Sequence, residues 1–542
     1  MISLYHQTLD KFGLYGINHF IEKFGIPIAI NESSQSGIII SYGCPVRGNF
    51  VISIDRNEIQ NAICGQVTTP LEKVSICEIP HNSGFGDEVI ANFENGIQKY
   101  PCVVRKKNSI SIGIDIFEET GYILSGHLDA IQSSHDQSIK TEIATQPSVD
   151  FLENILFEAI LSGCQYQKIP LVQKSYWPEG KTFAVCLTHD VDEIKKTYQW
   201  ISRPLKFILR KNLTGLEGQI KSFAQKFRGI EPYYTYEDII KIERELSAKS
   251  TYFILKESGK VNPFFIKTWY LYGRNRSLQS SKMQALIRKL LENGDEVAIH
   301  GSYFSFKNPR LLQEEVQELE QLINEKILGT RQHNLNLEIP TTWHYQIDAG
   351  LKYDTTLGFK DRIGFRWGTS FPFYPNSRGE PISMLEIPTI IMDICLESSN
   401  NKESDCLQLA AEVERYHGVL NLLWHPPIFN ELEYPEARSI YIKINTHCKT
   451  KEAWITNACN IYKWIALRNQ FSVSYNFDPV NKTLRIHVDP EIGEQFLTLY
   501  LPNQTTCHIG SNNAKIIKAD DNCVFIKINP SPDEKEIFVG LV

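Results

Sequence analysis

Phe183-Ala-Val-Cys-Leu-Thr-His-Asp-Val-Asp192 is the stretch on which the fold prediction depends. Its apolar half, residues 183–187, has the length and composition of a buried parallel strand. The strand is followed by polar residues, and α/β sheets and barrels place their active sites at the carboxyl ends of strands. Asp190 and Asp192 point the same way in extended chain, so they can share one site. The alternative is that one of them caps a helix beginning at Glu193.

Composition restricts the class of protein. The 542 residues suffice for two to four domains, and 42% hydrophobic and 22% charged residues are typical of a globular protein. A net charge of −7 argues against a nucleic acid or an anionic membrane as the main partner. We expect a soluble, cytoplasmic protein, since neither a signal peptide nor a transmembrane segment is found in the sequence. The 12 scattered cysteines are predicted to be reduced thiols.

The sequence pattern predicts three regions. Residues 1–178 mix short strands and helices and are predicted to form an α+β accessory domain that ends in a linker at 168–180. Strands and helices alternate over residues 179–470, which indicates a parallel α/β sheet or barrel. Residues 471–542 alternate with period two and predict a small all-β sandwich. Its expected role is packing, with glycan binding as the alternative.

The middle region begins with an unusual connection. Residues 193–234 are basic and aromatic, and they are too long for an ordinary strand-to-helix loop, so we expect an insertion over the site. Its basic excess suits an acidic substrate, with a solvated helical face as the alternative. Beyond it, a helix is predicted at 281–292 and another from Asn308-Pro309 to about Ile327. Further strands are predicted at 250–255, 296–300, 329–333, 383–391 and 419–424.

Polar residues gather near the ends of these strands. They are Asp190, Asp192, His300, Arg331, His333 and His425. In a barrel the strand ends converge on one face, so two acids, three histidines and an arginine predict a hydrolytic or metal site there. Asp354 and Asp393 follow further strand-like stretches and are candidates for orienting the site residues, with a turn cap as the alternative for Asp354.

Four motifs resemble those of the polysaccharide deacetylases, the NodB-homology superfamily or carbohydrate esterase family four. They are the Thr188-His-Asp-Val-Asp192 strand end, Ser250-Thr-Tyr-Phe-Ile-Leu255, Gly294-Asp-Glu-Val-Ala-Ile-His300 and Leu422-Leu-Trp-His425. The resemblance covers about residues 183–470. It implies a distorted β/α barrel of about seven strands that removes acetyl groups from an N-acetylated sugar. A barrel joined to an N-terminal α+β domain is similar to proteins encoded for bacterial surface-polysaccharide production.

The resemblance also implies a role for each motif residue. Asp190 matches the general base, and Arg331 matches the arginine that orients it. Asp192 and His300 match ligands of a divalent metal, with zinc expected. His425 matches the acid that protonates the leaving amine. The spacing of the two aspartates is similar to the Asp-x-Asp branch of the superfamily.

One position departs from the family pattern. Phe304 stands where the second metal histidine is expected, and Asp192 with His300 alone is too small a ligand set for a divalent ion. We assign His333 as the missing ligand, with His344 as the other candidate and a structural or substrate-binding role as the alternative. Some relatives whose motif starts with His-Gly look like metal-independent amide hydrolases.

Three aromatic residues are assigned to a sugar-binding platform: Tyr303, Trp343 and Trp424, with core packing as the alternative for each. Three functions remain open at this point. The first is a metal-assisted deacetylase acting on a carbohydrate, and the second is a metal-free hydrolase of a small amide or ureide. The third is an inactive glycan-binding protein in which Phe304 marks decay of the site.

Overall fold

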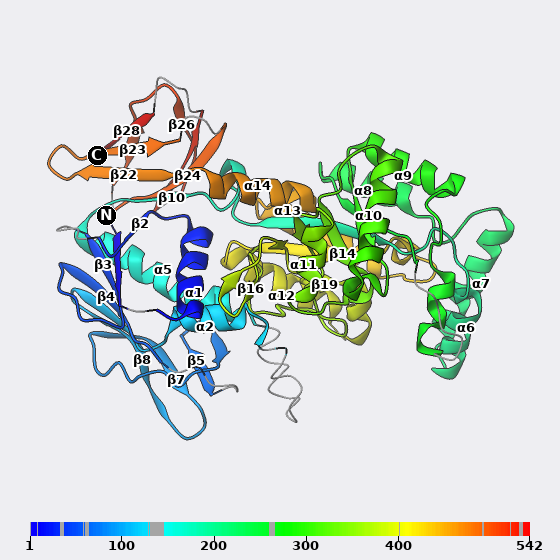
Figure 1. Ribbon diagram of the computed structural model, residues 1–542, viewed down its shortest axis with the longest axis horizontal. Helices are drawn as coiled ribbons and strands as arrows, with labels where there is room; N and C mark the ends of the chain where they lie inside the picture. Colours follow the sequence, from blue (N-terminus) through cyan, green and yellow to red (C-terminus); the bar gives the residue numbers. More distant parts are fainter. Residues whose placement is uncertain are drawn as a thin grey trace.

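The computed structural model arranges the chain along one long axis (Figure 1). The N-terminal and C-terminal sheets lie together at one end, and the middle region follows. A helical hairpin, α6 (Gln199–Leu209) and α7 (Leu213–Phe227), lies at the opposite end. The structure describes residues 2–7, 9–32, 37–57, 59, 64–127, 129, 146–258, 266–399, 401–489, 493–503, 505–520, 522–529 and 535–542.

The N-terminal region is a nine-stranded mixed sheet with helices, which confirms the predicted α+β class. Neighbouring strands are parallel from β2 through β1, β3 and β4 to β9, and antiparallel from β9 through β8, β7 and β5 to β6. The strands are β1 (Ile2–His6), β2 (Ile28–Ile30), β3 (Ile38–Tyr42), β4 (Phe50–Ile54), β5 (Gly65–Thr68), β6 (Lys73–Ile76), β7 (Glu88–Glu94), β8 (Lys99–Lys106) and β9 (Ser109–Ile112). The helices are α1 (Lys11–Phe24), α2 (Ile116–Ile123) and α5 (Ser148–Gln167).

The middle region is a curled parallel sheet, in agreement with the predicted distorted barrel. Its order is β18-β15-β14-β13-β12-β11-β20-β19, with β21 also paired to β11, so it has more strands than the seven expected. Its strands are β11 (Ala184–Val191), β12 (Thr251–Leu255), β13 (Glu296–Gly301), β14 (Gly329–Gln332), β15 (Tyr353–Asp354), β18 (Leu385–Glu386), β19 (Ile391–Met392), β20 (Val419–Leu423) and β21 (Trp454–Thr456). A separate hairpin pairs β16 (Asn376–Ser377) with β17 (Glu380–Pro381).

The strand predicted at 383–391 is wrong as a single element. The chain instead forms β18, passes Pro388 and forms β19, and these two short strands lie at opposite edges of the sheet. Proline cannot donate to a strand ladder, which explains why the apolar run does not continue as one strand. The connection carries Thr389, whose hydroxyl donates to the Thr355 carbonyl at 2.8 Å, across the sheet end where the site lies.

The helices of the middle region begin and end largely as their caps predict. Ser280 accepts a hydrogen bond from the Met283 N–H, and Gly294 ends the same helix in the left-handed conformation. Asn308 caps the helix whose first residue is Pro309. The helices are α8 (Tyr236–Glu245), α9 (Ser281–Asn293), α10 (Pro309–Ile323), α11 (Thr341–Asp348), α12 (Lys402–Arg415), α13 (Ala437–Thr450) and α14 (Ala458–Gln470).

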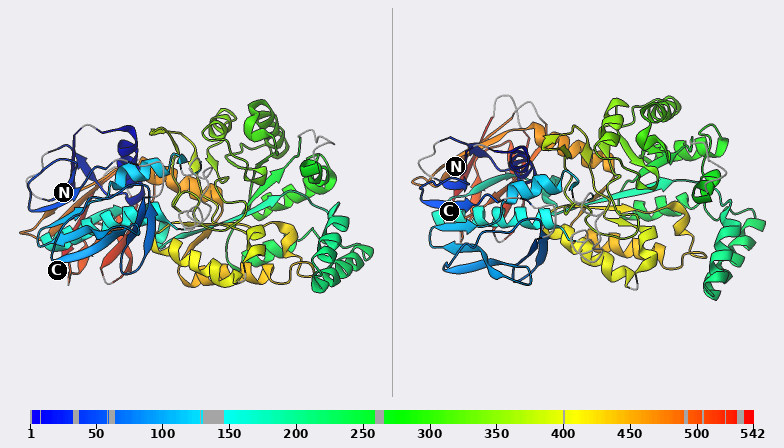
Figure 2. Two further views of the ribbon diagram at one scale, coloured as in Figure 1. Left: turned by 90° about the horizontal axis from the view of Figure 1, so that it is seen from below. Right: turned by 60° about the horizontal axis from the view of Figure 1, so that its bottom comes forward.

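The segment predicted to be an insertion forms two helices, α6 (Gln199–Leu209) and α7 (Leu213–Phe227). They contact each other and project from the rest of the molecule in every view (Figure 2). Within the described part of the chain, no helix is long and apolar enough to span a membrane.

The C-terminal region contains two four-stranded antiparallel sheets, which confirms the predicted sandwich. One has the order β22-β23-β28-β25 and the other β10-β24-β27-β26. The strands are β10 (Leu171–Lys174), β22 (Val473–Asp478), β23 (Thr483–Val488), β24 (Gln495–Tyr500), β25 (Cys507–Ile509), β26 (Ala514–Ala519), β27 (Cys523–Ile528) and β28 (Glu536–Leu541). β10 lies in the segment expected to be a linker, and Val172 from it joins the core of the sandwich.

Candidate active site

The two aspartates of the opening stretch lie at the end of a strand. β11 runs through Val191, so Asp190 is still in the strand and Asp192 follows it directly. Both side chains are buried. The helix-cap alternative is wrong, because the next helix in the chain, α6, begins only at Gln199.

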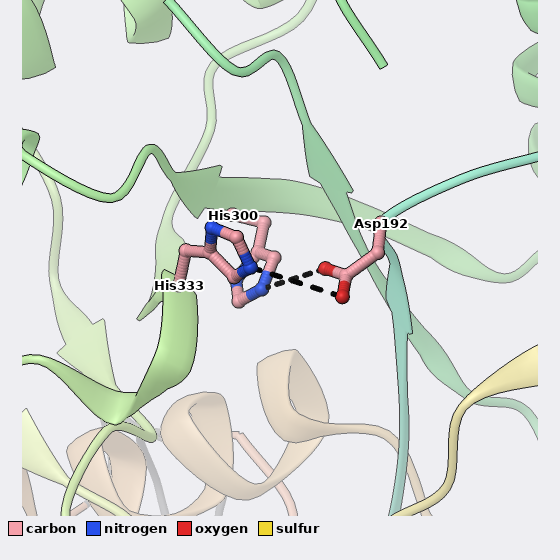
Figure 3. Close-up of side chains that lie close together, drawn as sticks. All are labelled: Asp192, His300 and His333. Atoms are coloured by element: carbon pink, nitrogen blue, oxygen red, sulfur yellow. Dashed lines mark ion pairs between the residues drawn. The ribbon is translucent and has the colours of Figure 1, made fainter. Parts of the chain in front are cut away.

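Asp192, His300 and His333 form a buried group whose ligand atoms all lie within 4.8 Å of one another (Figure 3). Asp192 Oδ1 is 3.3 Å from His300 Nε2, and Asp192 Oδ2 is 3.8 Å from His333 Nε2. The structure therefore brings together the three residues that were assigned as ligands. His344, the other candidate, is exposed on α11 and is not a member of this group.

The hydrogen bonds of the two histidines fix which ring nitrogen faces the aspartate. His300 Nδ1 donates to the Arg331 carbonyl at 2.8 Å, and His333 Nδ1 donates to Glu257 Oε2 at 3.2 Å. Each Nε2 is therefore directed to Asp192 without a proton when the ring is neutral. Such an arrangement of lone pairs and a carboxylate is unfavourable unless a proton or a cation lies among them.

The group fits a divalent ion. Asp192 Oδ1 is buried and accepts no hydrogen bond from the described residues. Two imidazole nitrogens and one carboxylate are a common donor set for zinc and for other divalent transition metals. Glu257 supplies a carboxylate that holds His333 in the tautomer whose Nε2 could bind an ion.

Arg274 is a residue of the site that no sequence motif marks. It follows a 3₁₀ helix (Ile266–Gly273), and its Nη1 lies 3.0 Å from Asp192 Oδ2 and 3.3 Å from Glu193 Oε1. Burial alone would raise the pKa of Asp192, but Arg274 and the histidines hold it well below its ordinary value. Glu257 was not predicted either, although it lies two residues after the end of β12 and fits the same strand-end pattern.

Asp190 is held by a buried arginine. Arg331 Nη1 donates to Asp190 Oδ1 at 2.8 Å, while the rest of the guanidinium binds Thr188 Oγ1 at 2.9 Å and the Thr355 carbonyl at 3.2 Å. Burial would raise the pKa of Asp190, but His300 and Arg331 lower it below its usual range. The carboxylate is therefore ionised, and Oδ2 is the oxygen that Arg331 does not bind.

His425 lies just after β20 and is paired with Asp393. Its Nδ1 is 2.8 Å from Asp393 Oδ1, and its backbone N–H donates to Asp393 Oδ2. Burial would lower the pKa of His425, but the Asp393 carboxylate raises it to about 9. Asp393 thus orients a site residue, whereas the Asp354 carboxylate is engaged locally, by the backbone N–H of Thr356 at 3.1 Å.

The aromatic residues assigned to a platform lie in different environments. Tyr303 is half-buried, with its ring centroid 6.2 Å from that of His333. Trp343 is fully buried and donates its indole N–H to Glu386 at 3.1 Å, so the platform prediction is wrong for this residue and core packing holds. Trp424 is also fully buried, against Tyr441, and offers no exposed ring.

Comparisons with known proteins give matches only among solved structures. No family model matches the chain, and no curated protein matches it. A protein assigned as a polysaccharide deacetylase from Mycobacterium smegmatis is 15% identical, with 55% of this chain and 94% of that chain covered and a TM-score of 0.37. PuuE allantoinase is 14% identical, with 54% and 93% covered and a TM-score of 0.36. A CE4 family pseudoenzyme from Bacillus anthracis is 13% identical, with 52% and 65% covered and a TM-score of 0.27.

Two of these names, polysaccharide deacetylase and CE4 family, are those of the family that the four motifs resemble, and the third is not. The identities and TM-scores are too low to assign an activity to this chain, and the three proteins are named for three different functions. The case for a function therefore rests on the geometry of the site.

Proposed function

We propose that this chain is a hydrolase of a non-peptide carbon–nitrogen bond, and specifically a metal-dependent deacetylase of an N-acetylated sugar. The observation that carries the proposal is the convergence of three units at one end of the barrel sheet. They are the Asp192, His300 and His333 group, the Asp190 carboxylate on Arg331, and the His425 imidazole on Asp393. A structural site has no need of an ionised base and a protonated acid beside a ligand group.

Asp192, His300 and His333 are the residues that would hold the ion, with zinc as the first expectation. A divalent ion bound there would polarise the acetamide carbonyl and the attacking water. Asp190 is the general base: it is ionised, and Arg331 fixes its orientation. Its Oδ2 accepts the proton of the water as the water attacks.

His425 is the general acid. With Nδ1 bonded to Asp393 and a pKa raised to about 9, its ring is protonated at neutral pH. The Nε2 proton is then available for the nitrogen that leaves as an amine. The Asp393 carboxylate stabilises the imidazolium, so the proton leaves Nε2 only when negative charge develops on the leaving nitrogen.

The substrate class comes from the family resemblance, and Tyr303 is a half-buried aromatic side chain beside the ligand group, as is Tyr270. A sugar face is well suited to packing on such a ring. We therefore propose Tyr303 as a substrate-contacting residue.

Arg274 supports a second candidate function, the metal-free hydrolysis of an amide or ureide. Its guanidinium already lies 3.0 Å from Asp192 and supplies a positive charge where an ion would bind. In this case Asp192 positions Arg274, and Arg274 in place of an ion stabilises the oxyanion.

Elemental analysis of the purified protein beside the Asp192→Ala variant tests the proposal. About one equivalent of a divalent transition metal that is lost in the variant, together with chelator-sensitive release of acetate from N-acetylated oligosaccharides, is expected. Metal-free protein that hydrolyses amides in the presence of a chelator establishes the second candidate. If Asp190→Asn leaves the function in cells intact, the result contradicts Asp190 as the base and favours an inactive glycan-binding protein.

A further inference from the structure

The α6–α7 hairpin, residues 199–230, has its polarity reversed. The residues of α7 that pack on the body of the protein are Gly218, Gln219 and Ser222. Gln219 and Ser222 both donate to the buried carboxylate of Glu433, which also pairs with Lys196 at 2.6 Å. The side of the helix that faces the protein is therefore polar, whereas a surface helix normally buries its apolar side.

The apolar side of the hairpin faces solvent. On α6 the exposed residues recur at i, i+4, i+7 and i+8, which places them on one face, and a similar stripe runs along α7. They are Ile201, Leu205, Ile208 and Leu209 on α6, Leu213, Ile220, Phe223 and Phe227 on α7, and Ile230 beyond it, with exposures of 51–80%. These nine side chains are among the 24 large apolar side chains exposed in the described residues. So dense an apolar surface marks an interaction site.

The same hairpin is strongly basic. Residues 199–230 contain seven Lys or Arg and a single Glu, a net charge of +6 in a chain of −7. Lys221 pairs with Glu217, the one acid of the hairpin, at 2.6 Å, and Lys226 pairs with Glu231, just beyond residue 230, at 2.6 Å.

Two copies of such a surface repel each other when they meet face to face, so charge disfavours a dimer through this hairpin. The apolar stripe of α7 is flanked by Lys221, Lys226 and Arg228. On α6, by contrast, Arg203, Lys206 and Arg210 line a cavity beside the barrel. An apolar stripe flanked by basic residues is instead complementary to an anionic lipid surface.

From this combination we infer that the α6–α7 hairpin is a membrane-docking element, which inserts its apolar face into the interface of an anionic bilayer. The hairpin lies at one extreme end of the molecule, away from both termini, so nothing in the described chain obstructs its approach to a flat surface (Figures 1 and 2). The inference does not depend on the proposed deacetylase activity, since it concerns where the protein binds and not what it cleaves.

The base of the hairpin is joined to the candidate active site. Gln199, the first residue of α6, donates to Glu193, which pairs with Arg274, which in turn pairs with Asp192. A docked hairpin therefore holds the site at a fixed position relative to the lipid surface. This arrangement suits a substrate that is itself carried by the membrane.

A cavity of about 320 Å³ gives a second connection. It lies between α6 and the barrel and reaches Trp424 and Asp393, the partner of His425. Basic residues around the cavity are Arg203, Lys206, Arg210 and Lys402.

The test is co-sedimentation of the full-length protein with vesicles. Vesicles of phosphatidylcholine with about 30 mol% phosphatidylglycerol are compared with pure phosphatidylcholine, at about 0.1 M and about 0.5 M salt. Binding to the anionic vesicles that weakens with salt is expected.

Two variants separate the apolar and the electrostatic contributions. The apolar variant combines Leu209→Ser, Leu213→Ser and Phe227→Ser. It is expected to weaken vesicle binding at least about tenfold, because it removes apolar area that would be buried in the bilayer interface. The basic variant combines Lys211→Glu and Arg228→Glu. It is expected to weaken binding to anionic vesicles about tenfold or more.

Matched control variants come from equally exposed residues of the N-terminal region. The apolar control is Leu71→Ser with Phe85→Ser and Ile97→Ser, whose wild-type side chains are 78%, 97% and 92% exposed. The basic control is Lys106→Glu with Lys107→Glu, both exposed. Both controls should bind vesicles like the wild-type protein.

Three results overturn the inference. They are the absence of vesicle binding by the wild-type protein, equal loss of binding in hairpin and control variants, and a wild-type dimer in sedimentation that the apolar hairpin variant converts to a monomer. The last result assigns the surface to a second copy of the chain. Amide hydrolysis on soluble substrates, measured in parallel, reports separately on the proposed function.

Discussion

The strand-end site and the α6–α7 hairpin depart from ordinary protein design in opposite directions. At the site, charge is buried: Asp190, Asp192 and Arg331 are all at most 7% exposed. On the hairpin, hydrophobic side chains are exposed, and Leu213 and Phe227 are each 80% exposed. Burying a charge lowers the free energy of unfolding, and an exposed apolar side chain contributes no stabilisation from burial. Both features are therefore unfavourable for stability, and each indicates a functional role.

Neutralising the buried base gives the largest expected effect. Asp190→Asn keeps the size of the side chain and an acceptor for Arg331 but removes the carboxylate, so kcat should fall about 10³-fold or more. Kinetics on an N-acetylated oligosaccharide measures this, with metal content and thermal midpoint as controls. A variant that remains folded, metal-loaded and fully active contradicts the role of Asp190.

Removing the third ligand should affect metal binding next. His333→Ala should weaken binding of the divalent ion at least about 100-fold, because a carboxylate and one imidazole are left. His344→Ala is the matched control, since His344 is an exposed histidine outside the ligand group. Competition with a chromogenic chelator measures both affinities, and equal affinities exclude His333 as a ligand.

The pH profile should report on His425. Its pKa is raised to about 9, so the ring is protonated below that pH, and kcat should fall as the pH rises through about 9. Asp393→Asn removes the carboxylate that raises this pKa. The basic limb of the profile should therefore shift to lower pH, with kcat at pH 8 reduced about tenfold. A limb that stays in place shows that His425 is not the acid.

The smallest effect concerns two neighbouring hairpin residues with opposite environments. Gln219→Leu should lower the free energy of unfolding by about 1–3 kcal/mol, because it leaves Lys196 and Glu433 partly unpaired in a buried site. Ile220→Gln, at a side chain that is 65% exposed, should leave it unchanged within about 0.5 kcal/mol. Urea unfolding measures both, and the reverse order would mean that α7 packs by its apolar face.

Much of the barrel and of the candidate site could be predicted, because strand runs and helix caps that are visible in the sequence lie close to the polar site residues. The apolar run into Asp190 and Asp192 marks a strand end, and Asn308-Pro309 and Gly294 mark helix ends that the structure confirms. His333 was predicted by requiring a third ligand, a chemical constraint that residue spacing alone does not express, and the structure places it beside Asp192 and His300.

The remaining features depend on contacts that no local pattern encodes. Arg274 reaches Asp192 from a segment without a strand-end signal, and whether Trp343 lines a site or fills the core depends on its neighbours in space. The net charge of −7 argued against an anionic membrane as a partner. That value is a sum over the whole chain, so it does not show that residues 199–230 carry a net positive charge.

The pairing of β10 with β24 has a consequence for dissecting the chain. The barrel begins after β10 and ends before β22, so the C-terminal sandwich joins the two ends of the barrel segment and closes it as a loop. Truncation at residue 470 would strip β10 of its partner and leave Val172 uncovered at a bare strand edge, which favours aggregation. A minimal fragment that contains the barrel should therefore retain the sandwich, and loss of the last strands should destabilise both ends of the barrel segment together.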